Sequence, residues 1–455
     1  MRSTVLMATV CAAVGMALTP VSARQQAPSA AAQAAAPPAA PAPEDPIKTM
    51  AGRLDLEKYK AAIKGLTQFG DRRQGTERNR KALDWIEAQL KSYGCTNTER
   101  ITYTYTPRAA GGRGGRGAAG ADAAAGAAGA TGAGAAGATG AGAAGAGAAG
   151  ATAQGRGRGN ADPTAGQGGS RIRGIRRRTG VNSDPTLQPD EKLRALNTEQ
   201  TPAEPGPRQN VFCTKIGTTH PEEMYIVGAH MDGIGWGEAA NDDGSGTALV
   251  MELARVFSSP DVQTERSIRF ALWNNEESGT EGAAAYVAQR KDLQGKEDPP
   301  GSGKYPEPKW LGMIQHDMMM FDHGMPLADG TLPKEQRPEA DVNVEFAKTS
   351  KFAAESQALA WLLHAANEKY ATDYPATVGP HMTNTDSGRF QDVVAAVSLR
   401  ENERGAQIGA GWDPQWHQPT DLYVTYSDKD FRLGLNAAQT TLGAVAQLTG
   451  ATLKK

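Results

Sequence analysis

Residues 224–246, MYIVGAHMDGIGWGEAANDDGSG, carry the clearest structural signal in the sequence. This stretch begins with a short apolar run, Met224–Ala229, which ends directly in His230 and Asp232. After a glycine-containing loop, Asn241 and Asp242 open an amphipathic stretch at 245–257. This pattern predicts a buried strand followed by a helix. In sheets built from such units, ligand sites form at the carboxyl ends of the strands.

The same alternation continues to the end of the chain. Further apolar runs occupy Ile268–Trp273, Leu311–Ile314 and Val393–Leu399, and amphipathic stretches occupy 279–289, 352–370 and 431–448. Upstream, Thr76 is expected to cap a helix that ends at Tyr93, and a strand is expected at Ile101–Tyr105. Strands that alternate with helices predict an α/β fold, with a mixed, mostly parallel central sheet and helices on both faces.

The composition indicates one globular domain that is interrupted by low-complexity sequence. Gly accounts for 54 of 455 residues, and Gly or Ala fills 35 of the 40 positions between 111 and 150. Because the segment 107–208 has no hydrophobic period and cannot offset its ordering entropy by burial, we expect a disordered insertion there. Residues 24–45, rich in Ala and Pro, are expected to be a linker. Residues 46–106 and 209–455 then form the single domain.

The first residues indicate export. Arg2 precedes an apolar run, Val5–Leu18, that is short for a membrane span, and the small residues at 21–23 suit a signal peptidase. We expect a signal peptide at residues 1–23, no later transmembrane segment and a periplasmic or secreted protein; an uncleaved anchor is the alternative. In an oxidising compartment, Cys95 and Cys213 form either a disulfide or two buried thiols.

The charge balance argues against a protein that coats nucleic acid. The 48 Lys and Arg residues are matched by 50 Asp and Glu residues. The arginines between 156 and 178 resemble RG-type nucleic-acid segments, but no aromatic residue accompanies them. We therefore expect no specific nucleic-acid partner, and interpret this segment as disordered or as loosely adhesive toward anionic envelope surfaces.

Histidines and carboxylates follow the predicted strand ends. Glu276 and Glu277 come after Ile268–Trp273, Asp317 comes after Leu311–Ile314, and His417 lies late in the chain. A helix cap or a solvated loop would explain each residue alone, but such residues need not gather at the edge of the sheet where ligands bind. Mixed His and carboxylate ligands suit catalytic zinc, with cobalt and manganese as alternatives.

The order of these motifs resembles the co-catalytic dizinc exopeptidases, the family that includes bacterial leucyl aminopeptidase and glutamate carboxypeptidase. The matching motifs are His-x-Asp at 230–232, Asn-Asp-x-x-Ser-Gly at 241–246, Glu-Glu-x-Gly-x-x-Gly at 276–282, Asp317 and His417. The resemblance covers residues 46–106 and 209–450. It implies the zinc exopeptidase fold, two zinc ions per chain and a peptide substrate.

The resemblance also implies a role for each motif residue. Asp242 would bridge the two zinc ions, with His230 and Asp317 completing one site and Glu277 and His417 the other. Asp232 would hold the second imidazole nitrogen of His230 and fix its tautomer. Glu276 would act as the general base that takes a proton from the metal-activated water.

The direction of cleavage stays open at this point. An exported aminopeptidase is the first reading, and a carboxypeptidase, a dipeptidase or a glutaminyl cyclase on the same scaffold are the alternatives. Glu401 and Glu403 would suit a substrate ammonium group, whereas Arg400 and Arg404 would suit a carboxylate. A non-enzymatic binding protein would have little reason to keep all these ligands. The family's Ser-Asp-His motif is represented by Thr385-Asp386-Ser387, which lacks the histidine; the oligomeric state is not indicated.

Overall fold

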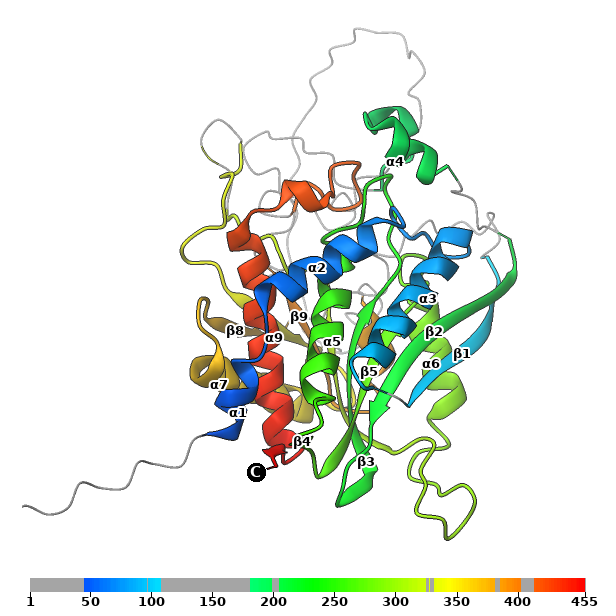
Figure 1. Cartoon of the computed structure of the whole chain (residues 1–455), viewed down its shortest axis with the longest axis vertical. Helices are drawn as coiled ribbons and strands as arrows, with labels where there is room; N and C mark the ends of the chain where they lie inside the picture. The colour runs from blue at the N-terminus through cyan, green and yellow to red at the C-terminus, as the bar shows by residue number, and fades with distance from the viewer. Residues whose placement is uncertain are drawn as a thin grey trace, which may run out of the picture. The chain divides into compact units, whose positions relative to one another are not determined.

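A mixed sheet of eight strands, in the order β1-β2-β5-β3-β6-β9-β7-β8, organises the described part of the chain (Figure 1). The computed structural model describes residues 45–95, 97–107, 181–198, 204–324, 327, 331–380, 385–401 and 413–454. The strands are β1 (Thr98–Tyr105), β2 (Gly206–Lys215), β3 (His220–His230), β5 (Arg266–Trp273), β6 (Lys309–His316), β7 (Val342–Phe346), β8 (Ala376–Gly379) and β9 (Ala396–Arg400).

The centre of the sheet is parallel and its margins are partly antiparallel. Strands β5, β3, β6 and β9 run parallel to one another. Strand β2 is antiparallel to both β1 and β5, and β7 is antiparallel to β9. A separate small sheet pairs β4 (Val262–Gln263) with β10 (Thr452–Leu453).

Helices cover both faces of the large sheet. On one face the larger hydrophobic core receives side chains from α1 (Pro46–Ala51), α2 (Leu56–Thr67), α3 (Glu77–Ser92), α5 (Gly244–Phe257), α7 (Ala353–Tyr370) and α9 (Asp428–Leu448). On the other face α6 (Glu281–Arg290) packs Ala283 and Tyr286 into a second core. In Figure 1, α2, α3, α5 and α9 lie in front of the strands. The α/β fold with helices on both faces is therefore confirmed.

Most predicted strands and helices are present, with ends that differ from the predicted ones by a few residues. The Thr76 side chain accepts a hydrogen bond from Asn79 N and caps α3, whose apolar stripe is buried. The run Val393–Leu399 becomes a strand only from Ala396, because the main-chain amides of Val393 and Val394 close a turn onto the carbonyl of Phe390. The described residues contain no helix long and apolar enough to cross a bilayer.

The structure differs from the prediction in part of the segment 107–208. Residues Pro185–Leu187 form a 3₁₀ helix, η1, and Glu191–Leu196 form α4. Asp184 and Asp190 cap these helices by accepting hydrogen bonds from main-chain amides within them. The segment therefore holds ordered structure at its carboxyl-terminal end. Residues 108–180 lie outside the described part of the chain, as do the predicted signal peptide and residues 24–44 of the predicted linker.

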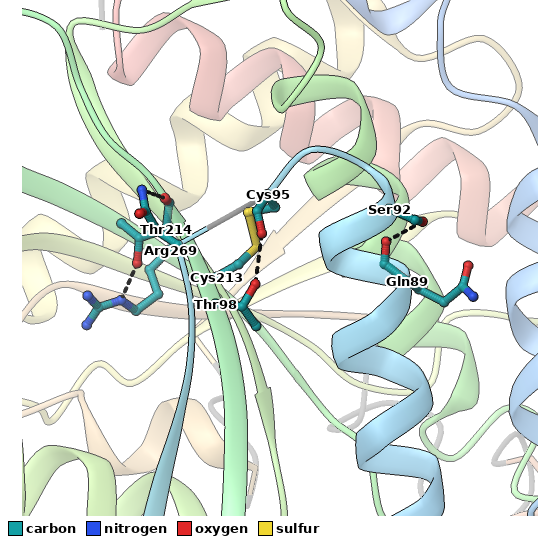
Figure 2. The surroundings of a disulfide bond; sticks show 8 residues. Gln89, Ser92, Cys95, Thr98, Cys213, Thr214 and Arg269 are labelled. Atoms are coloured by element: carbon teal, nitrogen blue, oxygen red, sulfur yellow. Dashed lines mark hydrogen bonds between the residues drawn. A yellow bond between two sulfur atoms is a disulfide. The ribbon is translucent and has the colours of Figure 1, made fainter.

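Of the two alternatives for the cysteines, the structure contains the disulfide. Cys95 follows α3, Cys213 lies in β2, and their Cα atoms are 5.9 Å apart. Figure 2 shows the bond beside Thr98, whose hydroxyl donates to the carbonyl of Cys95 at 2.8 Å. The bond fastens the end of α3 to the antiparallel part of the sheet.

Candidate metal centre

The parallel strands bring the predicted ligands to one edge of the sheet. His230 is the last residue of β3 and lies beside Trp273, the last residue of β5. Ala229 pairs with His316, the last residue of β6. Glu276, Glu277 and Asp317 therefore follow the strands at the same edge as His230. Asp242 reaches this edge just before α5, where its main-chain amide donates to Asp421 Oδ2 at 3.1 Å.

Five buried side chains form two groups that could each hold a metal ion. In the first, His230 Nε2 lies 3.3 Å from Asp242 Oδ1 and 3.8 Å from Asp317 Oδ1. In the second, His417 Nε2 lies 2.9 Å from Asp242 Oδ2 and 2.9 Å from Glu277 Oε2. Asp242 belongs to both groups and turns a different oxygen toward each histidine. The structure thus brings together all five residues proposed as ligands.

Asp232 supports this arrangement differently from the prediction. His230 Nδ1 lies 3.0 Å from the main-chain carbonyl oxygen of Asp232, whereas the nearest carboxylate oxygen of Asp232 is 3.9 Å away. That carboxylate instead accepts a hydrogen bond from the main-chain amide of Glu276 at 3.0 Å. Asp232 therefore connects the end of β3 to the turn that carries Glu276 and Glu277.

Neighbouring histidines and carboxylates in the centre shift one another's pKa values. Burial opposes protonation of His417, but the negative charge of Glu277 and hydrogen bonds to Asp242 and Glu277 raise its pKa to about 10. Burial opposes ionisation of Asp242, yet hydrogen bonds from His230 and His417 hold its pKa well below the usual range. Both groups thus place carboxylates beside histidines that would have to release protons on binding a metal ion.

Glu276 and Glu277 have different surroundings. Burial raises the pKa of Glu277 to about 7, against the opposing charge of His417. Burial also raises the pKa of Glu276 well above its usual range. Glu276 belongs to neither of the two groups and is 8% exposed. Glu276 thus lies beside the two groups without being part of either, a placement open to a carboxyl group that transfers protons.

Neither Arg400 nor Glu401 is free to meet a substrate terminus. Arg400 is buried, and its guanidinium donates to Asp317 Oδ2 at 2.9 Å. Although burial would raise the pKa of Asp317, the charge of Arg400 helps to hold it at about 2. Glu401 accepts hydrogen bonds from the side-chain amide of Asn241 and from main-chain amides at 320 and 321. Glu403 and Arg404 lie outside the described residues.

The sequence interpretation missed a buried polar network beneath Asp242. Asn241 Nδ2 donates to Glu401 and to Asp413, and Asn241 Oδ1 accepts from two main-chain amides that follow Asp317. The Asp421 carboxylate accepts hydrogen bonds from the main-chain amides of Asn241 and Asp242. The motif Asn-Asp was the available signal: the asparagine holds the loop so that the aspartate can face both histidines.

The other histidines within the described residues point away from the two groups. His316 contacts the Gly228 carbonyl and the Thr441 hydroxyl. His323 lies between the Pro333 carbonyl and Asp430. Asp386, in the motif that lacks the family histidine, is buried and accepts a hydrogen bond from Gln315 at 3.2 Å.

Fold and site together define an α/β protein with paired His/carboxylate groups at the carboxyl-terminal ends of the parallel strands of its sheet. Residues 210–436 match the model of Peptidase family M28. The chain therefore contains a domain of Peptidase family M28, and the predicted family resemblance is confirmed.

Characterised relatives match limited parts of the chain. Aminopeptidase YwaD of Bacillus subtilis is 34% identical over 116 residues, which make up 25% of this chain and 23% of that protein. Human Carboxypeptidase Q is 32% identical over 82 residues, 18% of this chain and 17% of that protein. These matches cover less than a quarter of the relatives' own length.

Solved structures share the fold over most of the chain. The zinc aminopeptidase of Bacillus subtilis aligns with a TM-score of 0.52 and 16% identity, covering 87% of this chain and 96% of that one. The LapA aminopeptidase of Legionella pneumophila aligns with a TM-score of 0.51 and 13% identity, covering 90% and 75%. At these identities the likeness shows the fold alone.

Proposed function

We propose that this protein is an exported, zinc-dependent exopeptidase that acts as an aminopeptidase. The observation that carries the proposal is the position of Asp242, whose two carboxylate oxygens lie against His230 and His417 in two adjoining groups. A carboxylate shared in this way suits a bridge between two metal ions.

The residues fit zinc by their chemistry. Both groups combine one imidazole with carboxylates, the donor types that occur in catalytic zinc sites. Glu277 Oε1 is buried without a hydrogen-bond partner in the described part of the chain, so it is available to a metal ion. The two described cysteines do not compete for the metal, because they are joined in the disulfide.

Each group would then hold one ion, with Asp242 common to both. His230 and Asp317 complete one site, and Glu277 and His417 complete the other. When bound, such ions polarise the substrate carbonyl and make a water molecule acidic enough to lose a proton near neutral pH. In the metal-loaded protein Glu276 would be the group that takes this proton and passes it to the leaving amine. Asp232 holds His230 through its carbonyl and Glu276 through its carboxylate.

The position of Arg400 argues against recognition of a substrate carboxylate. Of the two arginines that would suit a substrate carboxylate, Arg400 is buried and paired with Asp317, and Arg404 lies outside the described residues. Among the described residues, Arg400 therefore does not offer its guanidinium to a substrate carboxylate, and this favours an amino terminus as the group that is recognised.

The test is mass spectrometry on three versions of one peptide: free at both ends, acetylated at the amino terminus, and amidated at the carboxyl terminus. We expect zinc-loaded protein to remove the first residue from the free and amidated peptides and to leave the acetylated one intact. A chelated sample is the control. Loss from the carboxyl terminus would move the assignment to a carboxypeptidase, the activity named for Carboxypeptidase Q. If none of the three peptides is cleaved, the exopeptidase proposal is rejected.

Export is supported by the disulfide, because such bonds persist mainly in oxidising compartments. Cys95 and Cys213 are both buried and joined in the structure. We propose that the signal peptide is cleaved after Ala23 and that the protein is periplasmic or secreted. Amino-terminal sequencing of the mature protein checks this: a start at Arg24 supports cleavage, and an intact Met1 contradicts it.

A further inference from the structure

The segment formed by residues 181–198, here called the bracing segment, is fastened to the rest of the protein by buried amide side chains. Asn182 is 7% exposed, and Gln188 and Asn197 are fully buried. The segment carries η1 and α4, which Figure 1 shows at the end of the molecule where α4 is labelled. Buried amides of this kind are uncommon unless every donor is satisfied, so their partners reveal what the segment holds.

Those partners lie in the two loops that carry the candidate ligands. Gln188 Nε2 donates to the Trp236 carbonyl at 2.8 Å and to the Pro419 carbonyl at 3.0 Å. The first carbonyl lies in the loop between His230 and Asp242, and the second lies two residues after His417. Asn197 Nδ2 donates to the Gly237 carbonyl at 2.8 Å. One side chain, Gln188, therefore joins both loops.

The contact with His417 itself is direct. The main-chain amide of Asn182 donates to the His417 carbonyl at 3.0 Å. The two loops also touch, since a Cβ atom at Gly235 would clash with the carbonyl group of His417. The bracing segment thus lies against the backbone of a residue whose side chain belongs to the second group.

His417 needs support from its backbone. Its φ of +57° is in the left-handed region, which a non-glycine residue keeps only when its surroundings hold it there. Metal-binding histidines usually donate their second ring nitrogen to a partner that fixes the ring, as His230 does toward the Asp232 carbonyl. His417 Nδ1 has no such partner among the described residues. Apart from the Nε2 contacts with Asp242 and Glu277, its orientation depends on the main chain and on Trp416, whose ring stacks at 4.1 Å.

We propose that the bracing segment is a positioning element for His417, and that Gln188 is its main positioning residue. The inference rests on the proposed metal-binding function and extends it to a part of the chain that the composition alone assigned to disorder. Without the Gln188 hydrogen bonds, the loop that carries His417 is free to move away from Asp242 and Glu277, and the second metal site weakens while the first remains.

The test compares two variants of the full chain that each lose a buried amide. Gln188→Met keeps the side-chain length but removes both donors. The matched control is Asn436→Leu in α9. Asn436 is also fully buried and donates a hydrogen bond to the Tyr374 carbonyl at 2.7 Å. Neither Asn436 nor Tyr374 belongs to the two metal-binding groups. Metal-free proteins are titrated with zinc in a calorimeter and with cobalt by absorption spectroscopy, and thermal melting reports folding.

We expect wild type to bind two ions, and Gln188→Met to lose about 10- to 100-fold in affinity for one of them. Asn436→Leu should melt earlier yet bind both ions as wild type does. If Gln188→Met does not fold, Asn197→Leu replaces it, and we again expect weaker binding of one of the two ions. A folded bracing-segment variant that binds both ions with wild-type affinity overturns the inference alone. A wild-type protein that binds no divalent ion overturns the proposed function and this inference together.

Discussion

Glu276 and Glu277 are neighbours in sequence with separate surroundings. Glu277 Oε2 lies 2.9 Å from His417 Nε2, whereas Glu276 belongs to neither candidate group. The main-chain amide of Glu276 is fixed by the Asp232 carboxylate, and Asn275 before it has a φ of +67°. This backbone allows consecutive carboxylates to serve different purposes.

Glu276→Gln is expected to retain both metal ions and to lower turnover about 100- to 10,000-fold, because the amide cannot accept the proton of the attacking water. Metal content by mass spectrometry and steady-state kinetics check this outcome. The control is Glu277→Gln, which should lose metal as well as activity. A metal-loaded Glu276→Gln enzyme with wild-type turnover would show that the base lies elsewhere.

His323 supplies a pH-dependent contribution to stability. Its Nδ1 lies 2.6 Å from the Pro333 carbonyl oxygen and its Nε2 lies 2.8 Å from Asp430 Oδ1, so the protonated ring donates twice. Burial opposes the charge, but the hydrogen bond to Asp430 raises the His323 pKa above its usual value. A raised folded-state pKa means that the contribution is complete below the unfolded value, about 6.5, and is lost as pH rises through the folded value.

We therefore expect the difference in unfolding free energy between wild type and His323→Gln to shrink as the pH rises above about 6.5 and through the raised folded-state pKa of His323. Urea denaturation across this range measures it. Phe321→Leu is the control, since it removes the ring stacked on His323 at 3.8 Å and leaves the imidazole hydrogen bonds in place. A difference that stays constant or grows with pH would contradict this account.

At the scale of elements, the disulfide joins α3 to the sheet. Cys95 and Cys213 are 118 residues apart in sequence, and the bond closes a loop that contains β1. Cross-linking such distant positions restricts the unfolded chain. Neither cysteine belongs to the candidate metal groups, so the bond is expected to affect stability without affecting metal binding.

Reduction is expected to lower the free energy of unfolding by about 2–5 kcal/mol. Guanidinium denaturation with and without dithiothreitol gives this value. The Cys95→Ala/Cys213→Ala double variant should show the lower stability in both conditions, which separates loss of the bond from other effects of the reductant. Equal stability of oxidised and reduced wild type would be inconsistent with a stabilising bond.

The elements that could be predicted are those with a clear hydrophobic period. Met224–Ala229 is an uninterrupted apolar run, and Ile268–Trp273 is apolar except for Arg269; both lie in the parallel centre of the sheet. The five proposed ligands could be placed because they follow such runs or sit in recognisable motifs. The supporting residues could not be placed from the sequence. A buried asparagine or glutamine, such as Asn241 or Gln188, looks the same in the local sequence as an exposed one, because its role arises only through tertiary contacts.

The bracing segment was missed for the same reason. It has few apolar residues, and its helices are held by polar side chains rather than by an amphipathic face. Weak local signals were present: Asp184 before Pro185 and Asp190 before Glu191 are cap sequences, and both act as caps. They mark where a helix can begin but do not show that it packs onto the domain.

For the molecule as a whole, the bracing segment divides the predicted insertion into two parts. Strands β1 and β2 pair from Thr98–Cys213 to Tyr105–Gly206, so the chain leaves the sheet and returns to it at one place. Replacing residues 109–178 with a Gly/Ser linker of about 30 residues, which spans about 30 Å, is expected to leave the melting temperature, metal content and peptide hydrolysis unchanged.

Extending that deletion to residue 199 should weaken metal binding, because it removes Asn182, Gln188 and Asn197 together. Calorimetry and kinetics on the two deletion variants measure the contrast. If the shorter deletion abolishes hydrolysis, the Gly/Ala-rich tract is itself required for activity. If both deletions behave as wild type, the bracing segment does not act on the centre.

The outermost position of β1 affects how copies of this protein meet. In the described part of the chain β2 is the only strand paired with β1, and an outer strand can offer unpaired main-chain groups to a strand of another molecule. Here Arg100 forms ion pairs with Asp84 and Glu87 of α3, and Glu99 forms one with Arg290 of α6. An incoming strand would have to accommodate these fixed charges, so the margin of the sheet disfavours edge-to-edge aggregation at high concentration.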